Sequence, residues 1–122
     1  MVNRISHTSH FTVTHNETAQ SMGSGDMPVL ATPALVAIME NAAMLAVATQ
    51  LEDGETTVGG SISVKHLKPS PVGATIIATA TLKNRDGHRM DFDITALQDD
   101  VVVGTATHTR FVVNRIKFMN KL

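Results

Sequence analysis

The sequence TPALVAIMENAAMLAVATQ occupies residues 32–50 and contains the longest apolar stretch of this chain of 122 residues. A threonine that can cap the first turn, followed by a proline whose missing N–H is harmless there, is typical of a helix start. We therefore predict a helix over residues 33–50. Its interior is apolar on nearly every side, with five alanines between positions 34 and 46, which indicates a helix enclosed by other structure and closely approached by a sheet.

The rest of the chain has the pattern of strands joined by short connections. Five segments alternate or are rich in β-forming residues, and they cover residues 11–13, 56–67, 74–83, 89–97 and 101–113. The last three are linked by short polar turns that favour hairpins, and residues 21–26 read as a loop. The sequence thus predicts a single α+β domain over residues 1–122, an antiparallel sheet of about five strands wrapped around one long central helix.

Composition excludes several classes of function. Lysine and arginine number 10 against 11 aspartates and glutamates, a net charge of −1, so no basic field exists to hold nucleic acid or an acidic membrane. The absence of cysteine rules out disulfides, thiolate nucleophiles and cysteine-ligated zinc, and suits the cytoplasm. Residues 1–15 lack the apolar core of a signal peptide. Glu40 and Asn41 interrupt the apolar stretch, which argues against a membrane span.

The carboxylate of Glu40, in the middle of this apolar helix, needs an explanation. An unpaired buried charge costs several kcal/mol, so the side chain must be paired, hydrated or functional. A desolvated carboxylate would suit a general base. A solvent-facing side chain or a subunit ion pair would instead be structural, and the residues by themselves leave both interpretations open.

His66 ends the second predicted strand, on the face that should meet the helix. Because alternate side chains of a strand point to the same face, this face should also contain Val58, Gly60, Ile62 and Val64. A histidine placed in this way is either a hydrogen-bonded core residue or a catalyst. A nearby carboxylate would favour the second interpretation by fixing the tautomer of the imidazole.

Thr32 also admits two interpretations. It can cap the helix, or its hydroxyl can act as a nucleophile if a base takes its proton. Glu40 lies eight residues further on, a rise of about 12 Å along a helix, so the two side chains of one chain would not readily touch. Either the Thr32 loop folds back, or the site is assembled from two chains.

Several short motifs together resemble one family. In chain order they are Ala31-Thr32-Pro33, Glu40, Thr57-Val58-Gly59, His66, Pro71-Val72-Gly73, Asp86-Gly87-His88-Arg89 and His108-Thr109-Arg110-Phe111-Val112-Val113. Over residues 27–118 they look like the fluoroacetyl-CoA thioesterase group, a branch of the hot-dog superfamily. In that group a threonine, a glutamate eight residues later and a histidine 26 residues after the glutamate form the catalytic set. Thr32, Glu40 and His66 occur at these spacings.

The resemblance implies hydrolysis of a short acyl-CoA thioester to a carboxylic acid and free CoA, without a cofactor. It also implies a homodimer whose sheets join edge to edge and that could pair further into a tetramer. Thr32, Glu40 and His66 would be catalytic, with Thr32 or water as the nucleophile. The backbone N–H of Gly59, with Gly60 beside it, would stabilise the oxyanion, although the two glycines could simply form a β-bulge.

The resemblance does not extend to the acyl pocket. The fluoroacetyl specialist closes its pocket with aromatic side chains, whereas this chain is only 3% aromatic. It approaches Thr32 through Met27, Pro28, Val29 and Leu30. We therefore expect a pocket for general short acyl chains instead of fluoroacetyl selectivity.

CoA carries phosphates, so cations are expected at the mouth of the site. Arg110 is the preferred candidate, because arginine can bind phosphate through two hydrogen bonds. The other candidates are Lys65, Lys68 and Arg115. His108 shares a strand face with Arg110 and is expected to be structural.

Other interpretations explain fewer of these residues. An acyl-CoA binding or sensing module without turnover would not need the three reactive side chains, and a hot-dog hydratase would need an Asp-His signature that we do not find. The N-terminal histidines His7, His10 and His15 lack a cysteine or carboxylate to complete a ligand set. We therefore expect no metal site and a mobile N-terminal segment.

Overall fold

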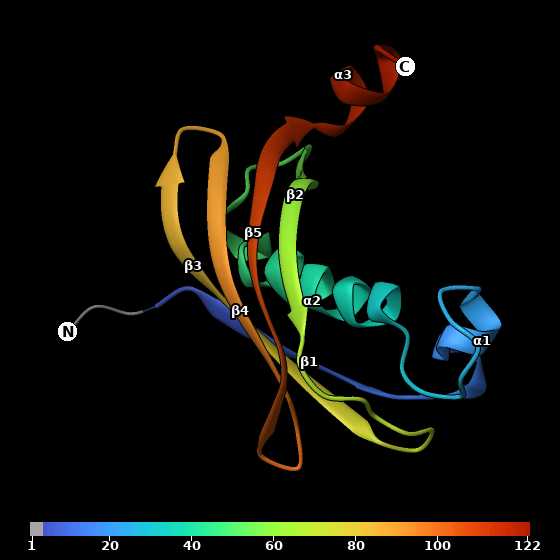
Figure 1. Cartoon of the computed structure of the whole chain (residues 1–122). Helices are drawn as coiled ribbons and strands as arrows, with labels where there is room; N and C mark the ends of the chain where they lie inside the picture. The colour runs from blue at the N-terminus through green and yellow to red at the C-terminus, as the bar shows by residue number, and fades with distance from the viewer. Residues whose placement is uncertain (1–3) are drawn as a thin grey trace.

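A long helix lies across the concave face of a five-stranded antiparallel sheet in the computed structural model, which describes residues 4–122 (Figure 1). The helix is α2 (Thr32–Ala46). The strands follow the order β1-β3-β4-β5-β2. Their bounds are Ser6–Thr12 (β1), Glu55–His66 (β2), Thr75–Asp86 (β3), Arg89–Gln98 (β4) and Val101–Asn114 (β5). The predicted α+β architecture is confirmed.

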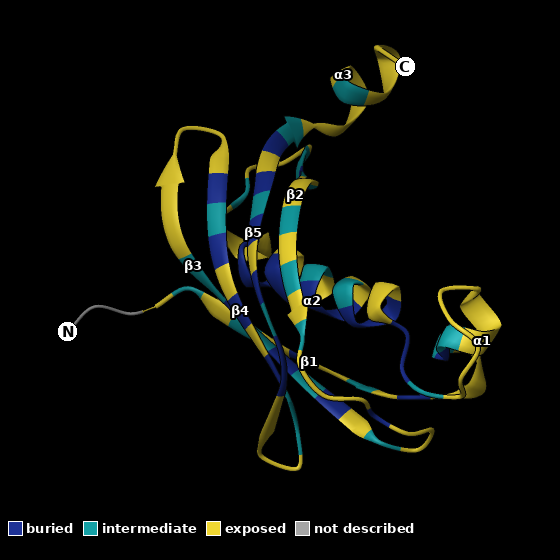
Figure 2. Ribbon diagram, viewed as in Figure 1, coloured by how far each residue is buried: buried dark blue, intermediate teal, exposed yellow. Residues whose placement is uncertain are grey.

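The inner face of α2 forms the centre of the core. Its buried residues are Ala34, Leu35, Ile38, Met39, Ala42, Ala43 and Ala46, and Figure 2 shows buried and exposed positions alternating along the helix. Small alanines on this face let the strands approach closely, as the sequence predicted. The stretch Thr32–Gln50 has a mean hydropathy of 1.4, enough by composition for a membrane span. Here the inner face of α2 packs against the sheet, while Met44 and Leu45 are exposed.

Helix α2 differs from the prediction at both ends. It ends at Ala46, and a separate 3-10 turn, η2, covers Ala48–Gln50, because the fully buried Val47 leaves the helical conformation. Ala31 is the N-cap, and no side chain caps the first turn. Thr32 is therefore the first helical residue, and its hydroxyl is available to another partner.

Side-chain direction along β2 reverses at a β-bulge. The pairing with β5 shifts across Gly60, and one extra residue moves the following side chains to the other face. His66 faces α2 as predicted. Thr57 and Gly59, which precede the bulge, face α2 as well, whereas Val58 and Gly60 lie on the opposite face, so the predicted placement of these two is wrong.

The N-terminal segment is more regular than predicted. His7 and His10 lie within β1, which pairs with β3 along its length, so the expectation of a mobile segment is wrong for them. A threonine-capped 3-10 turn, η1 (His15–Glu17), follows. The short helix α1 (Ala19–Met22) replaces the start of the predicted loop.

The two edges of the sheet are β1 and β2. Strand β2 has 12 residues, and no strand within residues 4–122 pairs with its outer side. Such an edge presents unpaired N–H and C=O groups that can pair with another chain. Near the start of β2, helix α3 (Arg115–Asn120) extends away from the body of the molecule (Figure 1).

Replacing Leu35 by alanine should lower the free energy of unfolding by about 3 kcal/mol, because removing a buried leucine leaves a cavity. The side chain is 0% exposed between α2 and the sheet. Leu45→Ala, 40% exposed on the same helix, is the matched control and should cost less than about 1 kcal/mol. Urea unfolding followed by circular dichroism measures both, and equal losses would contradict this placement of α2.

Candidate active site

Thr32 and His66 meet where α2 begins and β2 ends. Thr32 Oγ1 lies 2.8 Å from His66 Nδ1. The first turn of α2 presents an exposed Thr32, and the register after the bulge turns His66 toward it. A hydroxyl that donates to an imidazole nitrogen is the pairing used to activate a nucleophile. One chain therefore contains a complete hydroxyl–base pair.

The environment of His66 favours the neutral imidazole. Burial lowers its pKa, and the backbone of Lys68 acts in the opposite direction. When Thr32 donates to Nδ1, the ring proton must be on Nε2. A neutral ring with Nδ1 facing a hydroxyl can accept the proton of that hydroxyl.

A cavity of about 300 Å³ opens beside this pair. Its lining consists of Ala19, Ser24, Val29, Leu30, Thr32, His66, Leu67, Lys68 and Pro69. Val29 and Leu30 thus line it as predicted, whereas Met27 does not and is 61% exposed. The volume is at the low end of the range for small-molecule pockets, and the lining contains no phenylalanine, tyrosine or tryptophan, so its size suits a short acyl group.

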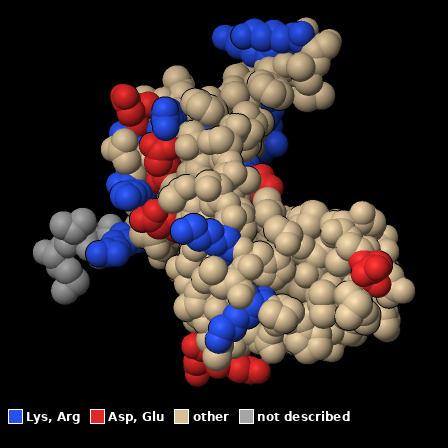
Figure 3. All heavy atoms as spheres, viewed as in Figure 1, with Lys and Arg blue, Asp and Glu red and all other residues tan. Residues whose placement is uncertain are grey.

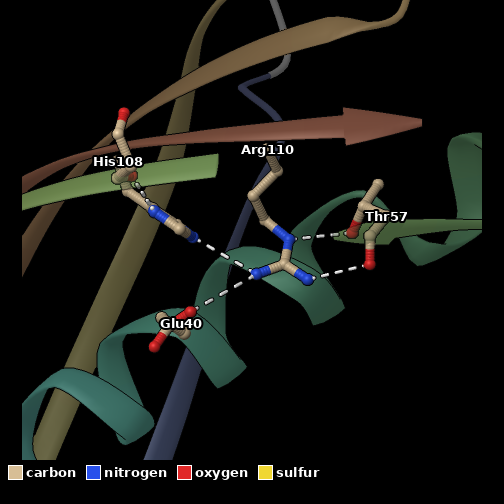
Figure 4. A network of polar contacts seen from close by, with 5 residues as sticks. Glu40, Thr57, His108 and Arg110 are labelled. Carbon is tan, nitrogen blue, oxygen red and sulfur yellow. Dashed lines mark hydrogen bonds and ion pairs between the residues drawn. The ribbon is translucent and has the colours of Figure 1, made fainter. Parts of the chain in front are cut away.

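Glu40 lies in a second cluster, further along α2 (Figure 4). Its Oε2 is 4.0 Å from Arg110 Nη1, and its side chain is 40% exposed. A Cβ atom on Gly59 would come within 3.0 Å of that oxygen. The missing side chain at Gly59 therefore gives the carboxylate its space. Glu40 is both paired and partly hydrated, which resolves how an acid is tolerated on this helix.

The prediction that Arg110 is exposed at the mouth of the site is wrong. Its side chain is buried, because Nε donates to Thr57 Oγ1 at 2.8 Å and Nη2 donates to the Thr57 carbonyl at 2.9 Å. Nη1 lies 3.2 Å from His108 Nε2. Burial lowers the pKa of the guanidinium, and the Glu40 carboxylate opposes this shift. A guanidinium held in this way is not free to bind phosphate.

The two clusters are separate within one chain. Strand β2 touches both, with Gly59 beside Glu40 and His66 beside Thr32. Seven positions separate Gly59 from His66, roughly 23 Å of extended strand, and the cavity at Thr32 contains no residue of the Glu40 cluster. A single chain does not bring Glu40 and His66 together, in line with the alternative that the site is assembled from two chains.

The remaining candidate cations are distributed over the surface. Lys68 lines the cavity at Thr32, whereas Lys65 points to the opposite face of the sheet and lines a groove there. Arg115 is exposed at the start of α3. On the face shown in Figure 3, Lys and Arg side chains lie among acidic ones or at the C-terminal end. Lys68 is the only one of these three that borders the cavity.

Sequence reasoning missed two functional candidates, Thr57 and His108. It assigned no role to Thr57 and treated His108 as structural, yet both bind Arg110. The signal was available on β5, where a period of two places His108 and Arg110 on the inner face. Their link to Thr57 depends on the pairing of β2 with β5, which the sequence does not specify.

The described residues contain no candidate metal centre. Within residues 4–122, no three histidines, aspartates or glutamates are grouped so that they could hold an ion. His7, His10 and His15 belong to no such group.

Comparison with known proteins identifies the family. Residues 13–116 match the family model of FlK, the fluoroacetyl-CoA-specific thioesterase. The chain belongs to this family. A curated relative, the fluoroacetyl-CoA thioesterase of Streptantibioticus cattleyicolor, is 36% identical over 94 residues, which is 77% of this chain and 68% of the relative.

Solved structures agree with this assignment. The fluoroacetyl-CoA thioesterase FlK has a TM-score of 0.90 and 31% identity, covering 99% of this chain and 94% of that chain. A variant of FlK in complex with acetyl-CoA has a TM-score of 0.91 and 30% identity, covering 99% of this chain and 96% of that chain. A Thermus thermophilus protein of the thioesterase superfamily shares the fold, with a TM-score of 0.90 and 21% identity, covering 98% of this chain and 89% of that chain. The predicted hot-dog fold is confirmed, and this FlK-family protein is an acyl-CoA thioester hydrolase.

The free energy of unfolding should decrease as the pH falls from about 7.5 to about 5.5. Burial lowers the pKa values of His66 and His108 from the ordinary 6.5. As the pH falls through that value, these histidines bind protons in the unfolded chain more readily than in the folded chain. Protonation therefore stabilises the unfolded chain, and the free energy of unfolding decreases. Urea titrations across this range should show a weaker pH dependence in His108→Gln.

The matched control for this prediction is His88→Gln, which removes an imidazole from the exposed turn between β3 and β4. It should leave unchanged the contribution of His108 to the pH dependence of the free energy of unfolding. Identical pH dependence in the two variants would contradict the buried, neutral state of His108.

Proposed function

We propose that this protein is a homodimer that hydrolyses short acyl-CoA thioesters at two identical sites. Each site would combine Thr32 and His66 of one chain with Glu40 and Gly59 of the other. One observation carries the proposal: the 2.8 Å contact between Thr32 Oγ1 and His66 Nδ1 forms in a single chain without Glu40. A partner chain would supply the missing carboxylate.

The free edge of β2 supports this arrangement. Antiparallel pairing of β2 with the partner's β2, about an axis between Ile62 and Ser63, sets Gly59 opposite the partner's His66, since both are equally far from the axis. The Glu40 cluster would then lie beside the partner's Thr32–His66 pair. Pairing of this kind also satisfies the exposed backbone groups of the edge outside the bulge at Gly59 and Gly60, and a two-fold interface generates both sites at once.

The proposed reaction begins with attack on the thioester carbonyl carbon. If Thr32 attacks, His66 takes the hydroxyl proton, the C–S bond breaks, and the CoA thiolate leaves with that proton. The partner's Glu40 then takes a proton from water, the hydroxide attacks the acyl-threonine ester, and the proton goes to the departing Thr32 oxygen. If water attacks directly, the partner's Glu40 takes its proton and returns it to the thiolate. Both routes give a carboxylic acid and free CoA, and neither calls for a cofactor.

The backbone N–H groups of Gly59 and Gly60 are suited to stabilise the oxyanion. The bulge removes Gly60 from the β2–β5 pairing, and both glycines are exposed. A Cβ atom at Gly60 would overlap the present position of the Phe111 ring, which is 39% exposed, so a larger residue there would require that ring to move. The bulge, the structural alternative for these residues, is present, and its position beside the Glu40 cluster supports the proposed oxyanion role.

The cavity and its cations support a short acyl group attached to CoA. Val29, Leu30 and Leu67 supply apolar walls without an aromatic ring, so selectivity for a fluorinated group is not expected. Lys68 stands at the rim. The dimer pairing would also carry Arg115, which hydrogen-bonds to Gly54 just before β2, toward the partner's Lys68. These two cations are our candidates for the CoA phosphates.

Purified protein should release free thiol from acetyl-, propionyl- and butyryl-CoA faster than from decanoyl-CoA, because the cavity is small. Glu40→Gln and His66→Ala should each lower kcat by a factor on the order of 10² or more, with folding retained by circular dichroism. Lys65→Ala, on the opposite face of the sheet, is the control. Tight binding of acyl-CoA without thiol release at any chain length would establish the alternative, a non-catalytic binding module.

Mixing two inactive variants tests the assembly of the site. In a heterodimer of a Glu40→Gln chain and a His66→Ala chain, one of the two sites regains both intact residues if the site spans the interface. Random exchange of subunits makes about half of the dimers heterodimers, each with one intact site. The mixture should then recover about a quarter of the activity of the wild type at the same protein concentration. No recovery, in a sample whose exchange is confirmed by native mass spectrometry, would show that the site lies within one chain.

A further inference from the structure

The network behind Glu40 contains two buried polar residues that the proposed reaction does not use. Figure 4 shows His108 and Thr57 on either side of Arg110, with the guanidinium directed at Glu40 on α2. Thr57 is 6% exposed and His108 is 3% exposed. Buried polar side chains are costly unless they are fully hydrogen-bonded, so their arrangement calls for a physical account.

His108 is held in one tautomer. Its Nδ1 lies 2.7 Å from the Ser61 carbonyl oxygen, which can only accept a hydrogen bond. The proton of a neutral ring is therefore on Nδ1, and Nε2 carries a lone pair. The lone pair faces Arg110 Nη1 at 3.2 Å. His108 thus serves the guanidinium as a hydrogen-bond acceptor.

Arg110 uses the rest of its donors in a fixed pattern. Thr57 accepts from Nε through its hydroxyl and from Nη2 through its carbonyl. Nη1 gives one hydrogen to His108, and its second hydrogen is left on the side of Glu40 Oε2, 4.0 Å away. Three hydrogen bonds on two sides of a planar group leave the guanidinium little freedom to rotate.

We propose that His108 and Thr57 are positioning residues that act through Arg110 to hold the Glu40 carboxylate in the slot left by Gly59. Neither residue touches the carboxylate. Carboxylate direction matters, because a misplacement of about 1 Å can cost on the order of 10²-fold in rate. This inference deepens the proposed function and rests on Glu40 being the catalytic acid–base group.

Two substitutions of His108 by an amide separate positioning from packing. In His108→Gln the amide group reaches the position of Nε2 and can accept a hydrogen bond from Arg110. In His108→Asn it reaches only the position of Nδ1, so it keeps the contact with Ser61 and loses the contact with Arg110. His108→Asn should lower kcat by roughly 10- to 100-fold with little change in KM. His108→Gln should retain kcat within about threefold.

A double-mutant cycle with Glu40→Gln shows whether His108 acts through the carboxylate. We expect His108→Asn to lower kcat in the wild-type background and to have almost no further effect in Glu40→Gln. Equal losses in both backgrounds would overturn the proposal, because a general structural defect does not depend on Glu40. Equal kcat in His108→Asn and His108→Gln would overturn it as well.

A measurement without substrate keeps this test separate from the proposed function. In ¹⁵N NMR spectra of the full chain, the wild type should show His108 protonated on Nδ1 and slowly exchanging Arg110 N–H resonances. These resonances should persist in His108→Gln and broaden in His108→Asn. If the wild type releases no thiol from any acyl-CoA, the proposed function fails, and the spectra still decide whether His108 positions Arg110. A His108 proton on Nε2 would overturn the positioning proposal.

Discussion

The packing of α2 into the concave face of the sheet is the contact on which the other features depend. Alanines on the inner face of the helix and strand glycines facing it allow the two layers to approach closely; a Cβ atom on Gly104 would come within 2.9 Å of the Leu35 side chain. This approach places one end of α2 against His66 and its middle against Gly59 and Arg110. Both clusters of reactive side chains are consequences of one helix–sheet contact.

The bulge at Gly60 adapts a regular strand to these two clusters. Before the bulge, Thr57 and Gly59 face the helix, and after it the direction reverses so that His66 faces the helix too. A strand without the extra residue would send one of these groups to solvent. The same bulge takes Gly60 out of the pairing with β5, and the space beside Glu40 comes from Gly59, which precedes it. One irregularity therefore lets Thr57 and Gly59 before it and His66 after it all face the helix.

The buried guanidinium shows why a charged residue identified by type can be assigned the wrong role. Arginine is a good phosphate ligand when its donors are free, and Arg110 was the preferred candidate for that reason. Its donors are instead occupied by Thr57 and His108. Burial and three hydrogen bonds keep this guanidinium beside the Glu40 carboxylate, and among the predicted cations Lys68 is the one that lines the cavity.

The sequence by itself determined the central helix, the five strands and their order along the chain, because the apolar helix, the alternating runs and the polar turns are local patterns. It did not predict the short helices α1 and α3. The inward direction of His66 could be read from its position in β2. The sequence also supplied Thr32, Glu40 and His66 as candidates through their spacing. Only the tertiary structure decided that Thr32 does not cap the helix, that Arg110 is buried, and that Glu40 and His66 of one chain lie apart. These facts depend on strand register, on the bulge and on where the helix crosses the sheet. They arise from contacts between residues far apart in the sequence, which no local pattern encodes.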